Sequence, residues 1–422
     1  MKMKKDNIEE ILIKELFSKF ENNTGKNIGV EIEMPLIELD GKDINLDNLQ
    51  KLFKYLVNNY EFKIDKIDNE GNCIAIKNNR YNDIISLEYS VNTLEFSLQE
   101  DANIYNMKTR FDFYYNTIEE FILKFNYKLI GSGINPNYKT INKKCLNEDR
   151  YLTIEKLLLG NPSNSVLYNQ FCAYVCSTQT HITPNINELH EVINVFTNIE
   201  WVKSLLYSNS RMNELNSNMA RDYLWQKSSF GKENTGKNIE YKSLDDIIEN
   251  YKTRLIHYIE RENKYYLIEK TNLSDFFKKE KLYGKDYDGS EMTIMPKIDD
   301  IKTFRSYKNI EITRMGTLEI RCDCTQKLEN IFEIVAFNVG IFEMYRDVAK
   351  LIKQYNFDTQ SIKNRILKQY NKKLNEKEKD FINILIETVI KGLKKRGKKE
   401  ELLLNKINEM RVKNEKGGLV VL

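Results

Sequence analysis

The chain has 422 residues, 41% of them hydrophobic, and its 65 lysines and arginines nearly balance its 62 aspartates and glutamates. A formal charge of +3 provides no global field that would recruit nucleic acid or an anionic membrane, so we expect neither as a partner. No window approaches the roughly 18 apolar residues of a membrane span, and the basic start MKMKKDNIEEILIKELF lacks the apolar stretch of a signal peptide, so we expect a soluble, cytoplasmic protein.

The first third of the chain alternates helical and strand-like patterns. Apolar residues three or four positions apart predict helices, and strict alternation of apolar with polar residues predicts strands. The predicted elements are a helix over 7–20, a strand over 28–39, a helix over 46–58, strands over 74–76, 84–89 and 93–98, and a long helix over 107–125.

The rest of the chain continues with isolated strands and long helices, which is typical of an α+β protein. We predict a strand over 173–182, a helix over 186–207, and strands over 310–313 and 317–321. From Leu328 onward the pattern is helical and increasingly basic, but acids interleave the cations, so a solvated helix face is expected there. With five prolines and no linker, the chain predicts one domain over 1–422, with an α+β core over 1–326 and a helical region over 327–422.

Two familiar kinds of site are excluded by spacing or context. The six cysteines do not follow zinc-ligand spacing and are expected to be reduced thiols. The stretch GKENTGKN over 231–238 copies the spacing of a phosphate-binding P-loop, but it ends in Asn where Ser or Thr would hold magnesium. No buried strand precedes it, so we expect no P-loop.

The first informative pattern is a pair of glutamates on one predicted strand. In the run GVEIE, Glu31 and Glu33 point to one face, because successive side chains alternate, and Val30 and Ile32 point to the other. Two carboxylates one pleat apart repel each other unless a cation lies between them. Taken alone, this pair is explained more simply by a strand whose polar face is wet.

A second run, LEYSVNTLEFS, repeats the pattern. Glu95 shares one face with Thr93 and Ser97, while the alternating apolar residues point to the other, and Glu88 ends the preceding strand.

The third run, RMGTLEIRCD, adds guanidinium groups to the carboxylates. Glu319, Arg321 and Asp323 are expected on one face of a strand, and Gly316 suggests a bulge or turn that re-aims Arg314. A sheet that collects the three runs would carry carboxylates and arginines in one funnel. Hard oxygen ligands suit magnesium, and arginines pair with phosphate in two places, so the combination indicates phosphoryl transfer from ATP.

These runs, in this order, resemble the glutamate–cysteine ligase family of the plant and bacterial type. GVEIE is similar to the opening GxExE strand of that family, and LEYSVNTLEFS to its second glutamate segment. GINPNY and the later DRY at 149–151 resemble its HP and GRY elements, and CSTQTH at 176–181 resembles its TxQxN strand. NS at 209–210, RDYLW at 221–225 and the final run ITRMGTLEIRCD resemble its NSP, RxxxW and closing strand elements, so the resemblance covers about 29–323.

The resemblance implies a glutamine-synthetase-like α+β fold, in which an antiparallel sheet flanked by helices forms a funnel-shaped active site. It implies ATP and Mg²⁺ as cofactors, amino acids as small-molecule substrates, and ligation of a carboxylate to an amine through an acyl phosphate. The nearest reaction is that of glutamate with cysteine, in glutathione biosynthesis, to give gamma-glutamylcysteine, ADP and phosphate. The implied roles are metal binding for Glu31, Glu33, Glu88, Glu95 and Glu319, stabilisation of the transferring phosphoryl group for Arg314 and Arg321, and substrate binding for Arg150, Gln179, Arg221 and Trp225.

The sequence departs from the family pattern at two places. YSVN at 89–92 replaces the common Pro-Gly-Gly-Gln turn, so the geometry of that loop is not implied by the resemblance. His181 replaces an Asn, and because a lone histidine on a strand is usually structural, it receives no catalytic role here.

Two other readings stay open. The chain could be a related ATP-dependent carboxylate-amine ligase with another donor or acceptor, in the synthesis of a peptide-like metabolite. It could also be an inactive homologue that acts as a binding protein. The presence of all five glutamates argues against that reading, because a site that no longer binds cations has no physical reason to keep mutually repelling carboxylates.

Overall fold

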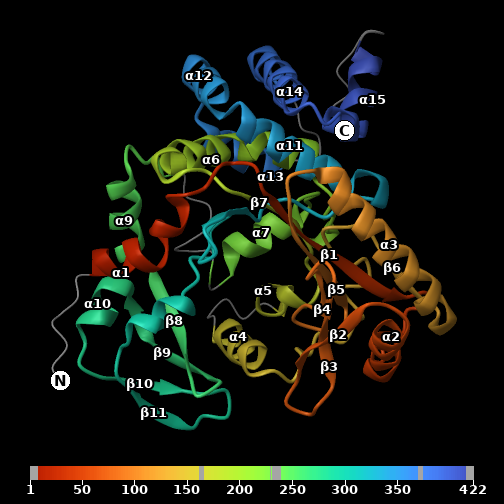
Figure 1. Cartoon of the computed structure of the whole chain (residues 1–422), viewed down its shortest axis with the longest axis vertical. Coiled ribbons are helices and arrows are strands. Elements are labelled where there is room, and N and C mark those ends of the chain that lie inside the picture. Colours follow the sequence, from red (N-terminus) through yellow and green to blue (C-terminus); the bar gives the residue numbers. More distant parts are fainter. Residues whose placement is uncertain (1–7, 161–165, 229, 231–238, 369–373, 415–422) are drawn as a thin grey trace.

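A large antiparallel sheet forms the centre of the fold. The computed structural model describes residues 8–160, 166–228, 230, 239–368 and 374–414. Within these residues nine strands pair antiparallel in the order β12-β13-β7-β1-β5-β4-β3-β2, with β6 pairing the far half of β1 (Figure 1). The strands are β1 (Ile28–Glu38), β2 (Phe62–Ile67), β3 (Cys73–Asn78), β4 (Ile84–Leu87), β5 (Thr93–Asp101), β6 (Tyr127–Leu129), β7 (Thr178–Ile182), β12 (Ile310–Ile312) and β13 (Leu318–Ile320).

The two faces of this sheet differ as the alternation predicts. Val30, Ile32 and Met34 of β1 are each at most 1% exposed, whereas Glu31 and Glu33 between them are only partly buried. The apolar face forms the core with the helices, and the polar face is free to build a site. The α+β class and the large antiparallel sheet are therefore confirmed.

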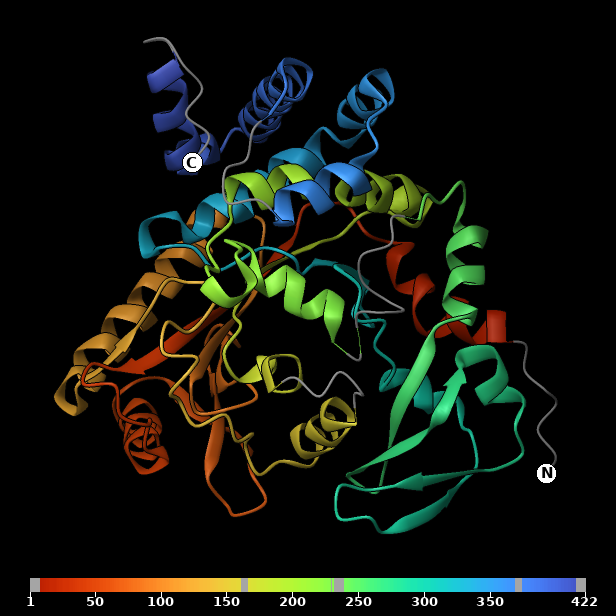
Figure 2. The same cartoon turned by 180° about the vertical axis from the view of Figure 1, so that it is seen from behind.

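Helices cover the apolar face in two layers. Figures 1 and 2 show α6 and α11 nearest the sheet, with α12, α14 and α15 farther out. Helix α11 is buried on all sides, since twelve of its thirteen residues are buried and only Glu343 is not. The helices are α1 (Ile8–Glu15), α2 (Leu46–Asn59), α3 (Ile104–Ile122), α4 (Asp149–Leu159), α5 (Val166–Asn169), α6 (Leu189–Leu206), α7 (Ala220–Lys227), α9 (Leu244–Lys252), α10 (Leu273–Lys278), α11 (Ile331–Glu343), α12 (Tyr345–Tyr355), α13 (Thr359–Lys368), α14 (Glu376–Arg396) and α15 (Asn405–Asn414).

A second, four-stranded antiparallel sheet was not predicted from the sequence. It runs in the order β11-β10-β9-β8, and both cartoon views place it on the other side of α4 from the strands β2 to β4. Its first hairpin turns at Glu262 and Asn263, whose φ angles of 52° and 64° are typical of a two-residue turn between twisted strands. The strands are β8 (Leu255–Arg261), β9 (Lys264–Asn272), β10 (Leu282–Lys285) and β11 (Glu291–Ile294).

Most predicted elements form, with shifted ends. The strand predicted over 84–89 stops at Leu87, because Tyr89 turns the backbone into the left-handed region at φ 59°. The strand predicted over 173–182 is confined to 178–182, and a 3-10 helix over Phe171–Ala173 precedes it. The helix predicted over 7–20 forms as α1 only to Glu15, and a 3-10 helix over Phe17–Phe20 follows it; residue 7 lies outside the described residues. In the described part of the chain, every helix is too short or too polar to cross a bilayer.

Candidate functional site

The strand order brings the three glutamate runs side by side on the polar face. Glu33 of β1 lies directly opposite Glu95 of β5, and Glu31 lies opposite Gln179 of β7. On the other edge of β7, His181 lies opposite Glu319 of β13. Strands that are far apart in the sequence therefore collect their polar side chains on one surface.

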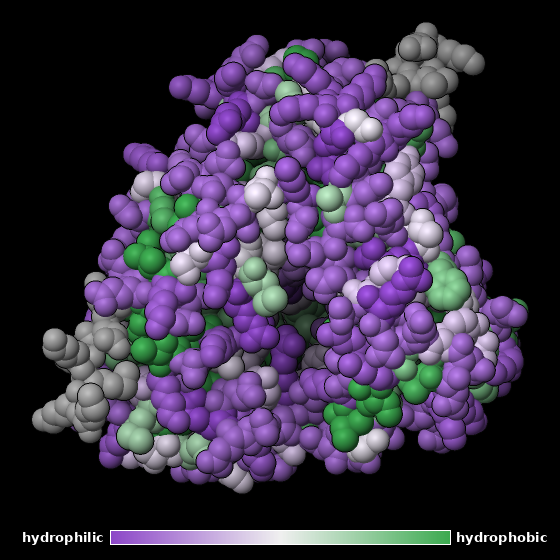
Figure 3. Space-filling view, in the orientation of Figure 1, coloured by the Kyte–Doolittle hydropathy of each residue, from purple (hydrophilic) through white to green (hydrophobic). Residues whose placement is uncertain are grey.

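This surface forms the wall of an open cavity of about 590 Å³. Figure 3 shows a hollow near the middle of the molecular face, in the region between the segments that Figure 1 labels β8 and β4. Nine of the residues singled out from the sequence line the cavity: Glu31, Glu33, Glu88, Glu95, Arg150, Gln179, Arg314, Glu319 and Arg321.

Glu33, Glu88 and Glu95, which we call the three-glutamate group, lie close enough that the charge of Glu88 opposes the ionisation of Glu33 and Glu95. Burial raises the pKa of Glu33 to about 7, against the charge of Arg221, and Glu88 adds to the rise. Burial raises the pKa of Glu95 well above its ordinary value, and the other glutamates of the site raise it further. Carboxylates held together in this way lower their repulsion when a cation binds between them.

Neighbouring donors fix two members of this group. Glu33 accepts hydrogen bonds from Ser177 N at 2.7 Å, from the Ser177 hydroxyl at 3.0 Å and from Gln179 Nε2 at 2.8 Å. Glu88 accepts one from the Tyr151 hydroxyl at 2.7 Å. These bonds orient each carboxylate and leave lone pairs free for another ligand.

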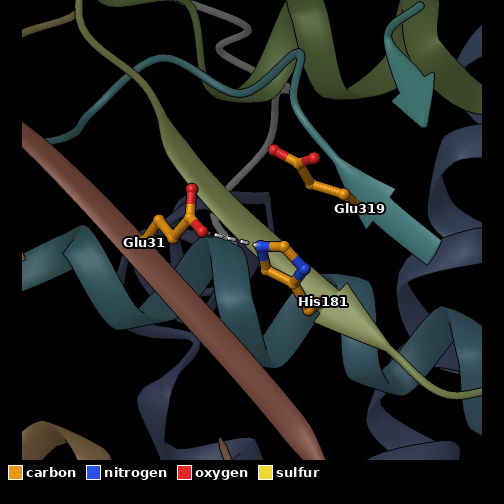
Figure 4. A group of neighbouring side chains, drawn as sticks. All are labelled: Glu31, His181 and Glu319. Carbon is orange, nitrogen blue, oxygen red and sulfur yellow. Dashed lines mark ion pairs between the residues drawn. The ribbon is translucent and has the colours of Figure 1, made fainter. Parts of the chain in front are cut away.

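Glu31, His181 and Glu319 form a second set, which we call the histidine group. One ligand atom from each lies within 4.8 Å of the other two (Figure 4). His181 Nε2 is 3.4 Å from Glu31 Oε1, and His181 Nδ1 lies 3.0 Å from the Thr317 hydroxyl. A fixed imidazole between two carboxylates is a ligand set that divalent cations accept.

The charges within the histidine group are coupled. Burial opposes ionisation of Glu31, but contact with His181 and the charges of Arg321 and Arg305 lower its pKa. Burial also opposes the charge on His181, yet Glu31 raises the imidazole pKa. For Glu319, burial raises the pKa despite the opposing charge of Arg321. The sequence offered one signal for His181, namely its place two residues after Gln179 on the same strand face.

Three predicted arginines lie in different parts of the cavity. Arg321 is only 24% exposed, and its Nη1 lies 3.1 and 3.3 Å from the two carboxylate oxygens of Glu319. Arg314 is exposed at the rim, on the turn that Gly316 makes at φ 78°. Arg150 lies in the first turn of α4, and although burial disfavours its charge, Tyr258, Tyr151 and Glu88 raise its pKa. Arg305, which sequence reasoning did not single out, lines the same cavity.

Arg221 and Trp225, also predicted as substrate-binding residues, do not line the cavity. Both lie on α7, and Arg221 is 5% exposed and close enough for its charge to lower the pKa of Glu33. The Trp225 ring packs edge-on against Phe171, with ring centroids 4.9 Å apart, and stacks with Tyr307 at 6.4 Å. Arg221 Nε and Trp225 Nε1 are buried without a hydrogen-bond partner among the described residues.

The orientation predicted for Asp323 is wrong. β13 ends at Ile320, so the alternation does not continue to Asp323. Its carboxylate lies on the helix side of the sheet, where it accepts hydrogen bonds from Lys203 of α6 and Asn338 of α11, both at 2.9 Å. Asp323 therefore ties the sheet to its helical cover.

Side chains brace the turn at 89–92. The Ser90 hydroxyl donates to the Ala173 carbonyl at 3.3 Å, and Asn92 Nδ2 donates to the Asn142 carbonyl at 2.7 Å. Tyr89 has a positive φ without being a glycine and is 3% exposed. The P-loop-like stretch at 231–238 lies outside the described residues.

The comparisons with known proteins found likeness in structure alone. No protein-family model and no curated protein sequence matches the chain. A bifunctional glutathione synthetase from Pasteurella multocida matches 98% of the chain at 11% identity and a TM-score of 0.44, and the chain spans about half (51%) of that protein. A glutamate–cysteine ligase from Francisella tularensis, in complex with AMP, matches 94% of this chain and 100% of its own at 11% identity and a TM-score of 0.28. Because both scores lie below 0.5, the case for function rests on the residues of the cavity.

Proposed function

We propose that the protein is an ATP-dependent ligase that joins a carboxylate to an amine, with glutamate as donor and cysteine as acceptor the first pair to test. One observation carries the proposal. Two groups of mutually repelling acidic side chains share one cavity with arginines, although they come from strands far apart in the sequence. A site that binds several divalent cations and phosphate oxygens together requires this combination.

The residues present fit divalent cations. Among the described residues, the histidine group has its three ligand atoms within 4.8 Å of one another and would hold one ion as it stands. The three-glutamate group would hold a second ion once its side chains draw together around it, since carboxylate oxygens are ligands that magnesium and manganese accept. Bound there, magnesium would neutralise phosphate charge during phosphoryl transfer.

The charge of the cavity also favours this reading. Seven glutamates and four arginines line it, so its wall has an acidic excess when the carboxyl groups are ionised. A nucleoside triphosphate without a bound cation would be repelled by such a wall, because both are negatively charged. Nucleotide binding should therefore depend on divalent cations.

The remaining residues would position the two organic substrates. Arg321 and Arg305 would contact phosphate oxygens, and Arg314 on the exposed turn would close over them from the rim. Gln179, whose Oε1 has no hydrogen-bond partner among the described residues, and Arg150 would bind the amino-acid donor. Arg221 and Trp225, behind the wall, would join them only if the donor reaches past Glu33.

The proposed reaction balances without a covalent enzyme intermediate. The donor carboxylate attacks the γ-phosphorus of ATP, the bond to the bridging oxygen breaks, and ADP leaves. The amine then attacks the acyl phosphate carbon, phosphate leaves, and the amine proton passes to solvent or phosphate. The preorganised guanidinium groups stabilise the negative charge that develops in both steps.

The test is to incubate the protein with ATP, magnesium, glutamate and a panel of amines, and to follow ADP release together with product mass. Formation of ADP, phosphate and an amide only when donor, amine and magnesium are all present supports the proposal. Amide formation with other amino acids in place of glutamate or cysteine would identify a related ligase. Release of AMP and pyrophosphate, or nucleotide binding without turnover on any pair, would refute the mechanism.

A further inference from the structure

A buried ion pair links the C-terminal helices to the rear of the cavity wall. Lys363 of α13 and Glu200 of α6 are 3% and 7% exposed, and Lys363 Nζ donates to Glu200 Oε2. Burial opposes the charge of Lys363, but Glu200 and Asp222 raise its pKa, so the lysine stays protonated. A buried pair of this kind is weak evidence for stability by itself, because desolvation offsets its attraction.

Glu200 has a second partner that leads toward the cavity. The same carboxylate oxygen, Oε2, accepts a hydrogen bond from Asn309 Nδ2 at 3.0 Å. Asn309 directly precedes β12, and its main-chain carbonyl accepts the backbone N–H of Arg321 at 2.8 Å. Because Arg321 directly follows β13, the backbone bond closes the open end of the β12–β13 hairpin, and the Asn309 side chain ties that end to α6.

The side chain of Arg321 then projects into the cavity. Its guanidinium lies 3.1 Å from Glu319, a member of the histidine group, and lines the cavity wall. Lys363, Glu200, Asn309 and Arg321 thus form a continuous path from a helix of the C-terminal region to a group in the site. Each of the three links between these four residues is a hydrogen bond with a defined donor and acceptor.

We propose that Lys363 and Glu200 are positioning residues: by holding Asn309, they fix the backbone at Arg321 and keep its guanidinium aimed into the cavity. The role of that guanidinium in phosphoryl transfer rests on the proposed function, but the mechanical link does not. A displacement of about 1 Å at a reacting group can cost roughly a hundredfold in rate, so small movements of this hairpin should be visible in turnover.

A matched pair of double variants separates positioning from burial of charge. In Lys363→Met with Glu200→Gln, the charges are gone but the Gln carbonyl still accepts the Asn309 hydrogen bond. In Lys363→Met with Glu200→Leu, the charges are gone and no acceptor remains. Arg365→Met with Glu378→Gln is the control for loss of another ion pair from the same helix, because Arg365 pairs with Glu378 of α14.

Two readouts test the proposal. Hydrogen exchange of the Arg321 backbone N–H, followed by mass spectrometry of peptides covering 309–321, should be faster by about tenfold or more in the Leu variant and near wild type in the Gln variant. In the ligation reaction, kcat of the Leu variant should fall by about tenfold or more, with the KM for ATP little changed, while the Gln variant stays within about threefold of wild type. The control should match wild type in both readouts.

Equal exchange at Arg321 in the two double variants would overturn the proposal, whether or not ligation occurs. Unequal exchange in a protein without ligase activity would keep the link and refute only the proposed function. If the Leu variant does not fold, Asn309→Ala, which removes the same hydrogen bond and leaves the ion pair intact, must show the faster exchange, and normal exchange there would overturn the proposal.

Discussion

At the scale of single residues, Glu319 offers the most direct test of the cavity. Its carboxylate lies between Arg321 and His181, and burial raises its pKa. If it holds a divalent cation beside the transferring phosphoryl group, Glu319→Gln should lower kcat by about a hundredfold, equivalent to about 2.7 kcal/mol of transition-state stabilisation. Higher magnesium should restore part of the loss by mass action. Steady-state kinetics over a magnesium titration measure both effects.

Glu100→Gln is the matched control for this change. Glu100 also lines the cavity, but it is exposed and belongs to neither proposed metal group. Its loss should leave kcat and the magnesium dependence near wild type, within the small effects of ordinary surface substitutions. A folded Glu319→Gln protein that ligates normally at low magnesium would remove Glu319 from the metal site.

Tyr89 tests whether backbone strain or packing of the ring contributes more to the stability of the turn at 89–92. A non-glycine residue at φ 59° costs about 1–2 kcal/mol, which Tyr89→Gly would relieve. The same change removes a ring that is 3% exposed and packs edge-on against Tyr151, a loss of about 3–5 kcal/mol for a buried aromatic side chain. We therefore expect a net destabilisation of about 2 kcal/mol by urea denaturation.

The control for Tyr89 is Asn356→Gly, at another left-handed residue. Asn356 ends α12 at φ 47° and is exposed, so glycine should change stability by no more than about 0.5 kcal/mol. A Tyr89→Gly protein more stable than wild type would show that strain, not packing, dominates this turn.

At the scale of elements, Glu333 of α11 makes the docking of α15 sensitive to pH. Its carboxylate accepts the backbone N–H groups of Lys406 at 2.7 Å and Ile407 at 3.1 Å. Burial nevertheless raises its pKa to about 7, from an ordinary value of 4.5. The folded protein thus binds a proton that the unfolded chain has lost between these values, so this group makes stability fall as pH rises from 4.5 to 7.

Between pH 4.5 and pH 7, Glu333 should lower the free energy of unfolding by about 3 kcal/mol. Glu333→Gln should remove this part of the pH dependence, measured by urea denaturation at several pH values. Glu329→Gln, at an exposed residue just before the same helix, should keep the wild-type curve. Identical curves for Glu333→Gln and wild type would contradict the assignment.

The elements that sequence reasoning predicted best are those with one wet and one buried face. In β1 and β5, alternation placed Glu31, Glu33 and Glu95 correctly on the polar side, and Gln179 of β7, which the family resemblance suggested, lies there too. It failed at Asp323, because a pattern of period two says nothing about where a strand ends. It also missed the small sheet, whose strands carry charged and aromatic residues on both faces and give no clean alternation.

At the scale of the whole molecule, the order of strands could not be predicted from periodicity. β7 lies between β1 and β13, so residues 31, 181 and 319 meet in one group although long segments separate them. Periodicity gives the face of each side chain but not its neighbour across the sheet. The resemblance to a family suggested a common funnel, and His181 and Arg305 entered the site only when the strands and loops were placed.

The same architecture predicts that the α+β part cannot stand without its helical cover. Twelve of the thirteen residues of α11 are buried, and Asn338 of that helix donates to Thr180 on β7 at 3.1 Å and to Asp323 at 2.9 Å. Behind it α14 packs so closely that a Cβ on Gly392 would lie 2.5 Å from the Gly340 carbonyl oxygen. Each large apolar side chain exposed by removal of this layer costs about 1.5–3 kcal/mol, so losing several exceeds the usual net stability of about 5–15 kcal/mol.

A chain of residues 1–326 should therefore show no cooperative thermal transition by calorimetry, and it should bind the hydrophobic dye that marks exposed apolar surface. Co-expression with a separate 327–422 chain should restore the transition, because the interface between the layers is intact in the two-chain protein. If residues 1–326 alone unfold cooperatively near the wild-type midpoint, the helices of 327–422 are not needed for the stability of the α+β part. In that case the path from Lys363 to Arg321 would be dispensable for the hairpin, and ligation by the truncated chain would show it directly.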